Sequence, residues 1–190
     1  MQLNLIAHPD TLPSQPAFKV WASVDHAGAF GATATTNIWF GVGAPASRFV
    51  IPASEEPSRA DELWKTTCFE IFLRETGSDA YQEWNFAPSG DWAAYGFSGH
   101  REGMTELEVS APPYIRMEDN LTWWTLGATI AVEAGKSWEF NLTAVLEEKA
   151  IRRSASFRPA RRCATPTPTS SAMAPPRPMC RCTPSRNSTT

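Results

Sequence analysis

Short runs of alternating apolar and polar residues recur along the chain, separated by turn-forming residues. The clearest three span 67–73, 81–86 and 92–97, with turn signals at 77–79 and 88–91 between them. Their β-branched and aromatic residues favour strands, and two tight connections in succession predict an antiparallel meander. The first run is apolar at most positions of both alternating sets, which is typical of a strand buried on both faces.

The same pattern predicts further strands on either side of this meander, and no window of helical length shows a 3.6-residue apolar stripe. We expect these strands at 18–24, 37–42, 48–51, 121–132 and 138–146. Seven to nine short strands at this spacing predict an all-β fold, an antiparallel β-sandwich.

Charge divides the chain into two parts. Residues 1–149 contain all twenty acidic residues, nine Lys and Arg residues and all eight Trp residues, so this part carries a net charge of −11. Residues 150–190 contain eight Arg residues and no acidic residue. We therefore expect one acidic, aromatic-rich domain over 1–149, followed by a basic tail over 150–190. An acidic domain is a poor candidate for nucleic-acid binding, because the phosphate backbone is also negatively charged.

The tail is rich in Pro, Arg, Ser and Thr and has no periodicity, which predicts disorder. Its three cysteines, Cys163, Cys180 and Cys182, lack the paired spacing and the histidine of a zinc site. A further hypothesis is a frameshift near position 150. Codons for the region from Arg161 onward, when read in another frame, can encode segments that are expected in related domains.

The remaining features predict a cytoplasmic protein. The first residues lack the basic start and apolar run of a signal peptide, and no apolar stretch reaches the length of a membrane span. Cys68 is the sole cysteine of the 1–149 part, so no disulfide framework is expected there. We expect neither a membrane nor a nucleic acid as partner.

Two polar residues interrupt the apolar meander. Glu70 lies among Cys, Phe, Ile and Leu, and Asn85 lies between Trp84 and Phe86. A buried polar group without a hydrogen-bond partner costs about 1–3 kcal/mol. A sugar hydroxyl, a bound ion or a neighbouring protein group would each satisfy them; alternatively, Glu70 faces solvent on an edge strand.

Trp64, the strand Cys68-Phe69-Glu70-Ile71-Phe72-Leu73 and the hairpin from Tyr81 to Gly90 together resemble the DOMON-like domains, which are related to the family-nine carbohydrate-binding modules. The resemblance is strongest over 59–104 and stops near 150. It implies two antiparallel sheets in an immunoglobulin-like or jelly-roll arrangement. It also implies a non-catalytic domain that binds a saccharide or a similar small ligand.

In the family-nine modules two tryptophans enclose a terminal sugar. Trp64 matches the motif tryptophan before the strand by position, and Trp92 or Trp84 would supply the second ring. Aromatic rings stack on sugar C–H faces while nearby polar groups bind hydroxyls. The candidate ligand-binding residues are therefore Trp64, Lys65, Glu70, Trp84, Asn85, Ser89, Trp92 and Arg101. The competing interpretation places these tryptophans in the core of the sandwich.

Other functions stay open. Some DOMON domains bind haem, for which His100 and Met104 are conceivable axial ligands. A protein-interaction domain without a small ligand would also display aromatic residues. Glu70 with Glu83, Asp61 with Glu62, or Asp91 would supply the paired carboxylates of a glycosidase. Cys68 is better explained as a small core residue than as a nucleophile. We expect no enzyme activity, no cofactor and no metal site.

Overall fold

The computed structural model describes residues 2–11, 14, 16–53 and 56–149. These residues form ten strands: β1 (Gln2–Leu5), β2 (Val20–Phe30), β3 (Thr33–Val42), β4 (Cys68–Glu75), β5 (Tyr81–Phe86), β6 (Trp92–Phe97), β7 (Thr105–Glu106), β8 (Tyr114–Asp119), β9 (Trp124–Glu133) and β10 (Trp138–Val145). Two single 3-10 turns, η1 (Ala46–Arg48) and η2 (Leu63–Lys65), are the helical elements of this part of the chain. None of its helices is long and apolar enough to cross a membrane.

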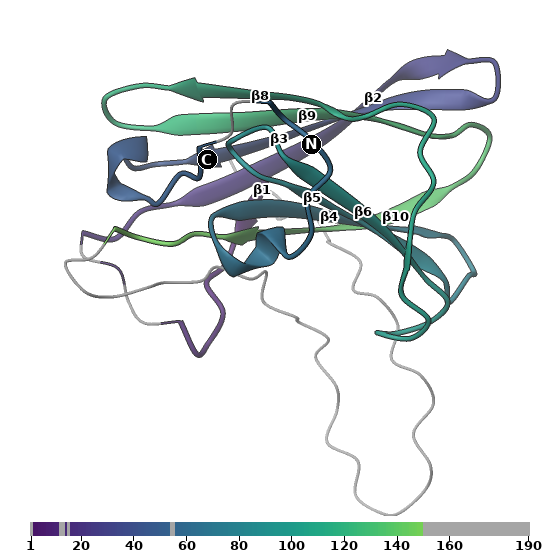
Figure 1. Cartoon of the computed structure of the whole chain (residues 1–190), viewed down its shortest axis with the longest axis horizontal. Coiled ribbons are helices and arrows are strands. Elements are labelled where there is room, and N and C mark those ends of the chain that lie inside the picture. The colour runs from purple at the N-terminus through teal and green to yellow at the C-terminus, as the bar shows by residue number, and fades with distance from the viewer. Residues whose placement is uncertain (1, 12–13, 15, 54–55, 150–190) are drawn as a thin grey trace, which may run out of the picture.

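The strands form two antiparallel sheets that pack face to face as a β-sandwich (Figure 1). The first sheet has the order β1-β2-β3-β9-β8, and the second has the order β10-β4-β5-β6-β7. All registered pairs are antiparallel, so the predicted fold class is confirmed. The meander of β4, β5 and β6 forms the middle of the second sheet.

The core lies between the sheets and follows from the alternation of each strand. In β4 the inward residues are Phe69, Ile71 and Leu73, and all three are almost fully buried. They face inward residues of the first sheet such as Phe40, whose ring lies 4.9 Å from that of Phe69. Trp124 joins this aromatic cluster from β9, 5.4 Å from the Phe69 ring. The core therefore accounts for the apolar half of each alternating run.

The prediction of a separate strand over 48–51 is wrong. Residues 46–48 form η1 instead, and Phe49 makes an isolated antiparallel bridge with Glu148, flanked by backbone hydrogen bonds from Val50 to Glu147 and from Lys149 to Arg48. Pro45 precedes the turn in extended conformation, and the buried Phe49 ring anchors the segment edge-on to Phe18, at 5.3 Å. The buried Phe49 ring and the ion pair of Arg48 with Glu148, at 3.0 Å, hold this segment against residues 147–149, so the contact stays one bridge long.

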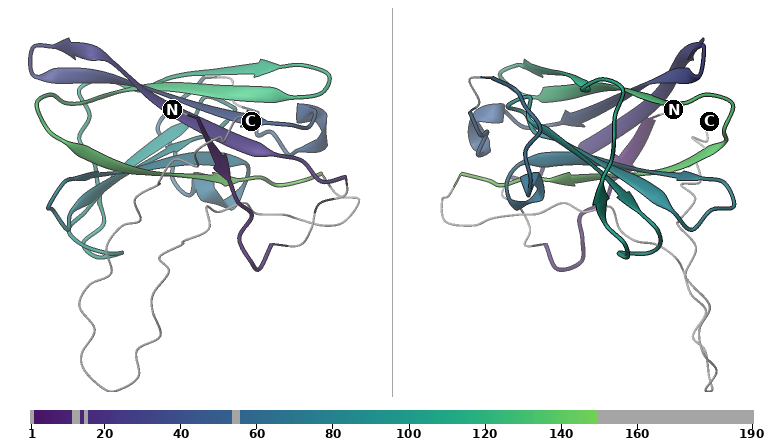
Figure 2. Two further views of the ribbon diagram at one scale, coloured as in Figure 1. Left: turned by 180° about the vertical axis from the view of Figure 1, so that it is seen from behind. Right: turned by 45° about the vertical axis from the view of Figure 1, so that its right-hand side comes forward.

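The predictions for β2 and β3 are too short. Both strands continue as a hairpin whose outer half, from Asp25 to Thr35, is largely exposed and projects past the second sheet (Figure 2). This part has no buried face, so apolar alternation cannot reveal it. The register of β2 against β3 shifts between His26 and Ala29, within this exposed part of the hairpin. The edge strands β1, β7 and β8 were also not predicted.

The interpretations of the tail concern residues outside the described part of the chain. They include disorder, the frameshift near position 150, and a site formed by Cys163, Cys180 and Cys182. The described chain ends at Lys149, whose backbone N–H donates to the Arg48 carbonyl at 2.8 Å.

Candidate functional site

The outward face of the second sheet collects polar residues from strands far apart in the sequence. Because alternate residues share a face, Glu70 and Phe72 of β4 point the same way. The register places Asn85 and Thr143 on either side of Glu70, and Glu83 and Asn141 on either side of Phe72. We call Glu70, Phe72, Glu83, Asn85, Asn141 and Thr143 the second-sheet face.

Glu70 is the most buried carboxylate of this face, with 8% of its surface exposed. β4 lies between β10 and β5, so the alternative of an edge strand facing solvent is wrong. The Thr143 hydroxyl donates a hydrogen bond to Glu70 Oε2. The partner that the sequence required is therefore a side chain from a strand 73 residues away. Only the register of β4 and β10 reveals it.

Asn85 is completely buried and links two neighbours. Its amide Nδ2 donates to Glu83 Oε1 at 3.0 Å, and its Oδ1 lies 3.9 Å from the Cys68 Sγ. Glu83 is only half-buried, so its carboxylate brings this chain of polar contacts to the surface. Asn85 thus holds Glu83 in place, and Glu83 carries the more exposed of the two side chains.

Trp64 lies at one side of the second-sheet face because η2 crosses over β4 and β5. Its ring meets that of Tyr95 edge-on at 6.1 Å, and the Tyr95 hydroxyl donates to Asp61 just before η2. Glu62 begins the turn in the left-handed conformation, with φ of 59°. The indole is half-buried. The segment is therefore pinned at Asp61 and presents an aromatic ring beside polar groups.

Trp84 and Trp92 point away from this face. Trp84 pairs with Ile71, whose side chain belongs to the core, and both tryptophans are members of the core, 2% and 7% exposed. Their rings stack at 6.3 Å. Arg59 covers Trp92 at 4.6 Å from the ring centre. The structure therefore places these two tryptophans according to the core interpretation.

The remaining candidate residues lie apart. Ser89 sits in the β5–β6 turn, where its hydroxyl donates to Asp91 Oδ2 at 2.8 Å. Lys65 is exposed beside Trp64 and forms an ion pair with Glu62. Arg101 lies in the loop after β6, at the opposite end of these strands from Ser89, and is exposed. Ser89 and Arg101 are thus not brought together.

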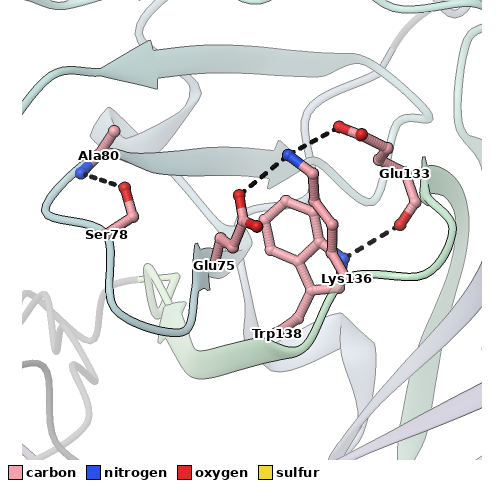
Figure 3. A network of polar contacts seen from close by, with 6 residues as sticks. All are labelled: Glu75, Ser78, Ala80, Glu133, Lys136 and Trp138. Atoms are coloured by element: carbon pink, nitrogen blue, oxygen red, sulfur yellow. Dashed lines mark hydrogen bonds and ion pairs between the residues drawn. The ribbon is translucent and has the colours of Figure 1, made fainter.

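A separate cavity of about 400 Å³ opens at the end of the second sheet near Arg101. Lys136 Nζ bridges Glu75 and Glu133 there, at 2.9 Å to each carboxylate, beside the ring of Trp138 (Figure 3). Hydrogen bonds to Glu133 and then Glu75 raise the pKa of Lys136. The Arg101 backbone N–H donates to the hydroxyl of Tyr81, a residue that lines this cavity, at 3.4 Å. The cavity carries its own satisfied ion pairs and is distinct from the second-sheet face.

The residues considered for other chemistries are also located. His100 and Met104 are both exposed in the loop after β6, and neither lines the cavity near Arg101. Within the described residues, no group of three or more His, Cys, Asp or Glu side chains is arranged to hold a metal ion. Glu70 and Glu83 share the second-sheet face in diagonal register.

Two buried acids near this face predict loss of stability at alkaline pH. Burial, and then the charge of Glu70, raise the pKa of the Cys68 thiol above its ordinary 9.0. Burial, and then the hydrogen bond to Asp61, raise the pKa of Tyr95 above its ordinary 10.0. Above about pH 9 the unfolded chain therefore releases protons that the folded chain retains. The free energy of unfolding should fall by up to about 1.4 kcal/mol per pH unit for each group.

Thermal unfolding from about pH 8 to about pH 11 measures this fall. The double variant Cys68→Ala/Tyr95→Phe should lose stability less steeply than the wild type, since neither substitute titrates. Identical slopes in the two proteins would contradict the assignment.

Comparison with known proteins gives a likeness in fold. No family model matches the chain, and no curated protein matches it. One solved structure, from Bacteroides uniformis and described as a "putative carbohydrate-binding protein", superposes with a TM-score of 0.52 at 14% identity. The match covers 83% of this chain and 75% of the other. At this identity the likeness establishes a shared β-sandwich architecture.

Proposed function

We propose that the second-sheet face binds a small saccharide without catalysing a reaction on it. The observation that carries the proposal is the placement of Trp64 beside a row of hydrogen-bonding side chains on one sheet face. An aromatic ring at the side and convergent carboxylate, amide and hydroxyl groups are the composition of a small-ligand site. The ring would stack on a sugar C–H face, and the polar groups would bind hydroxyls.

The roles differ along the face. Glu83 and Asn141 are half-buried and would contact the ligand first. Glu70 would accept a hydrogen bond through the small exposed part of its carboxylate, while Thr143 orients it. Asn85 would position Glu83. A neutral ligand suits this arrangement, because the face displays carboxylates and lies on a domain of net charge −11.

Two further lines support the proposal. The motif around Trp64 and Glu70 resembles the family-nine modules, and η2, which carries Trp64, contacts β4, which carries Glu70. The solved structure from Bacteroides uniformis, which shares the architecture, is described as a "putative carbohydrate-binding protein". The second tryptophan of the family-nine pair has no equivalent on this face, since Trp84 and Trp92 lie in the core. We therefore propose one-sided stacking on Trp64.

Replacing Trp64 with alanine tests the stacking role. We expect saccharide affinity to fall about tenfold or more, while the free energy of unfolding falls by only about 1 kcal/mol, because the indole is half-buried. Tryptophan fluorescence titration with a panel of mono- and oligosaccharides measures the affinity. Trp123→Ala removes a surface indole, 38% exposed, outside the site and is the matched control.

Equal affinities of the Trp64→Ala and wild-type proteins would refute stacking on Trp64. If no sugar in the panel shifts the wild-type fluorescence although the protein is folded, the protein-interaction alternative is favoured.

A further inference from the structure

The opposite surface of the molecule, the outward face of the first sheet, carries two tryptophans that the proposed function does not use. Inward residues of β2 and β3 such as Ala22 and Phe40 are buried, so Trp21 and Trp39 point outward. Trp39 is 42% exposed, and Tyr114, on the same outward face in β8, is 68% exposed. Exposed aromatic residues gathered on one sheet face indicate a binding surface.

Glycines on the adjacent strands allow both indoles to lie on the sheet. Gly41 stands opposite Trp21, and Gly127 stands opposite Trp39. A Cβ atom at Gly41 would lie 2.1–2.5 Å from three atoms of the Trp21 ring, and one at Gly127 would lie 2.7–2.9 Å from three atoms of the Trp39 ring. Nearly equal distances to three ring atoms mean that each glycine meets a ring face. The opposite ring face is therefore turned to the outside.

Trp21 and Trp39 lie on adjacent strands and are offset by two residues along the strand direction. A strand spacing of about 4.8 Å and a rise of about 3.4 Å per residue place them roughly 8 Å apart along the sheet. The arrangement is an open surface, in contrast to the single ring beside the second-sheet face. It suits a ligand that extends over several units.

Polar groups around the rings are mostly uncharged. Asn37 accepts a hydrogen bond from the Thr129 hydroxyl at 2.9 Å, next to Trp39. Arg116 and Glu118 form an ion pair on β8. Lys19, two residues before Trp21, and Asp25, four residues after it, are both exposed and carry opposite charges. A face whose charges balance in this way offers no net attraction to an ionic partner. Amide and hydroxyl groups beside aromatic faces complement a neutral polyhydroxylated chain.

We propose that this first-sheet face, formed by Trp21 and Trp39 on Gly41 and Gly127, binds a neutral polysaccharide chain. It is a second site, on the opposite side of the sandwich from the proposed small-saccharide site. The glycines position the rings, and the rings make the contact. The proposal does not depend on the second-sheet face, because no residue is shared.

Affinity gel electrophoresis of the full chain tests this site, with a soluble neutral glucan, a xylan or a mannan cast into the gel. We expect at least one polymer to retard the wild type. Trp39→Ala should weaken the retardation about tenfold. Gly127→Ala should weaken it as well, because the new methyl group displaces the Trp39 ring. Gly96→Ala is the matched control, since its methyl group would meet no atom closer than 3.6 Å.

Trp64→Ala separates the two proposed sites. Retardation that survives Trp64→Ala but is lost in Trp39→Ala and Gly127→Ala supports the first-sheet site. Retardation lost in Trp64→Ala and kept in Trp39→Ala overturns it, because the polymer then binds at the second-sheet face. Absence of retardation by all three polymers also overturns it. Sedimentation that shows a wild-type dimer and a Trp39→Ala monomer, again without retardation, identifies a second copy of the chain as the occupant.

Discussion

Replacing Trp84 with alanine is expected to lower the free energy of unfolding by about 3–5 kcal/mol, the cost of removing a large buried aromatic side chain. Trp84 is 2% exposed, stacks on Trp92 at 6.3 Å and packs on the inward side of β5. Its indole Nε1 donates to Gln82 at 3.3 Å, so the truncation also removes a hydrogen bond. Denaturant unfolding measures the change.

This experiment decides between the two roles that the sequence allowed for Trp84. The control is Trp123→Ala, which should lower stability by less than Trp84→Ala does, because 38% of the Trp123 side chain is exposed and it lies in a turn. A Trp84→Ala protein with wild-type stability and lost saccharide affinity would show that the indole is a ligand-binding face. Lost stability with saccharide affinity retained under folding conditions is the expected result.

Glu70→Gln is expected to weaken saccharide binding by about tenfold or more while leaving the fold intact. A hydrogen bond to a charged acceptor contributes about 1.5–3 kcal/mol, and the amide lacks that charge. The amide oxygen still accepts from the Thr143 hydroxyl, so the second-sheet face keeps its internal contact. Isothermal titration with the saccharide that responds best in the fluorescence panel measures the affinity.

Glu118→Gln is the matched control for this substitution. Glu118 pairs with Arg116 on the first sheet, so its neutralisation removes a carboxylate without touching the second-sheet face. Equal losses in Glu70→Gln and Glu118→Gln would indicate a general effect of net charge. A Glu70→Gln protein that binds like the wild type would remove Glu70 from the proposed site.

The sequence predicted best where local signals coincide. The bounds of β5 and β6 were predicted to the residue, because alternation over 81–86 and 92–97 ends at the turn of Pro88 to Asp91. Gly90 has φ of 93°, a conformation that glycine adopts readily. Burial of β4 on both faces is likewise confirmed from Cys68 to Ile71.

Prediction failed where the buried surface is small or the partner is distant. β8 alternates Ile115 and Met117 against Arg116 and Glu118, but it is a half-exposed edge strand directly after two prolines. The pairing of Glu70 with Thr143 depends on the register of β4 and β10, which alternation alone does not fix. Side chains alternate between the two faces of a strand, so the face of one residue is known once the face of its neighbour is known.

The placement of Trp84 illustrates this last point. It shares the parity of Phe86 within β5, and Asn85 has the opposite parity, so Trp84 and Asn85 point to opposite faces of the sheet. The sequence contained this constraint before the structure was known. The role of Gly127 beneath Trp39 did require the structure, since the two residues are brought together only by the pairing of β3 with β9.

The most direct test of the central proposal is an amide NMR spectrum of the full chain, recorded with and without each saccharide of the panel. The account predicts that one saccharide shifts the amide signals of Trp64, Glu70, Glu83 and Asn141 in a saturable manner and leaves those of Trp39 and Gly127 in place. Saturable shifts confined to residues away from the second-sheet face would contradict the proposed site. A spectrum of a folded protein that no saccharide changes would contradict saccharide binding itself.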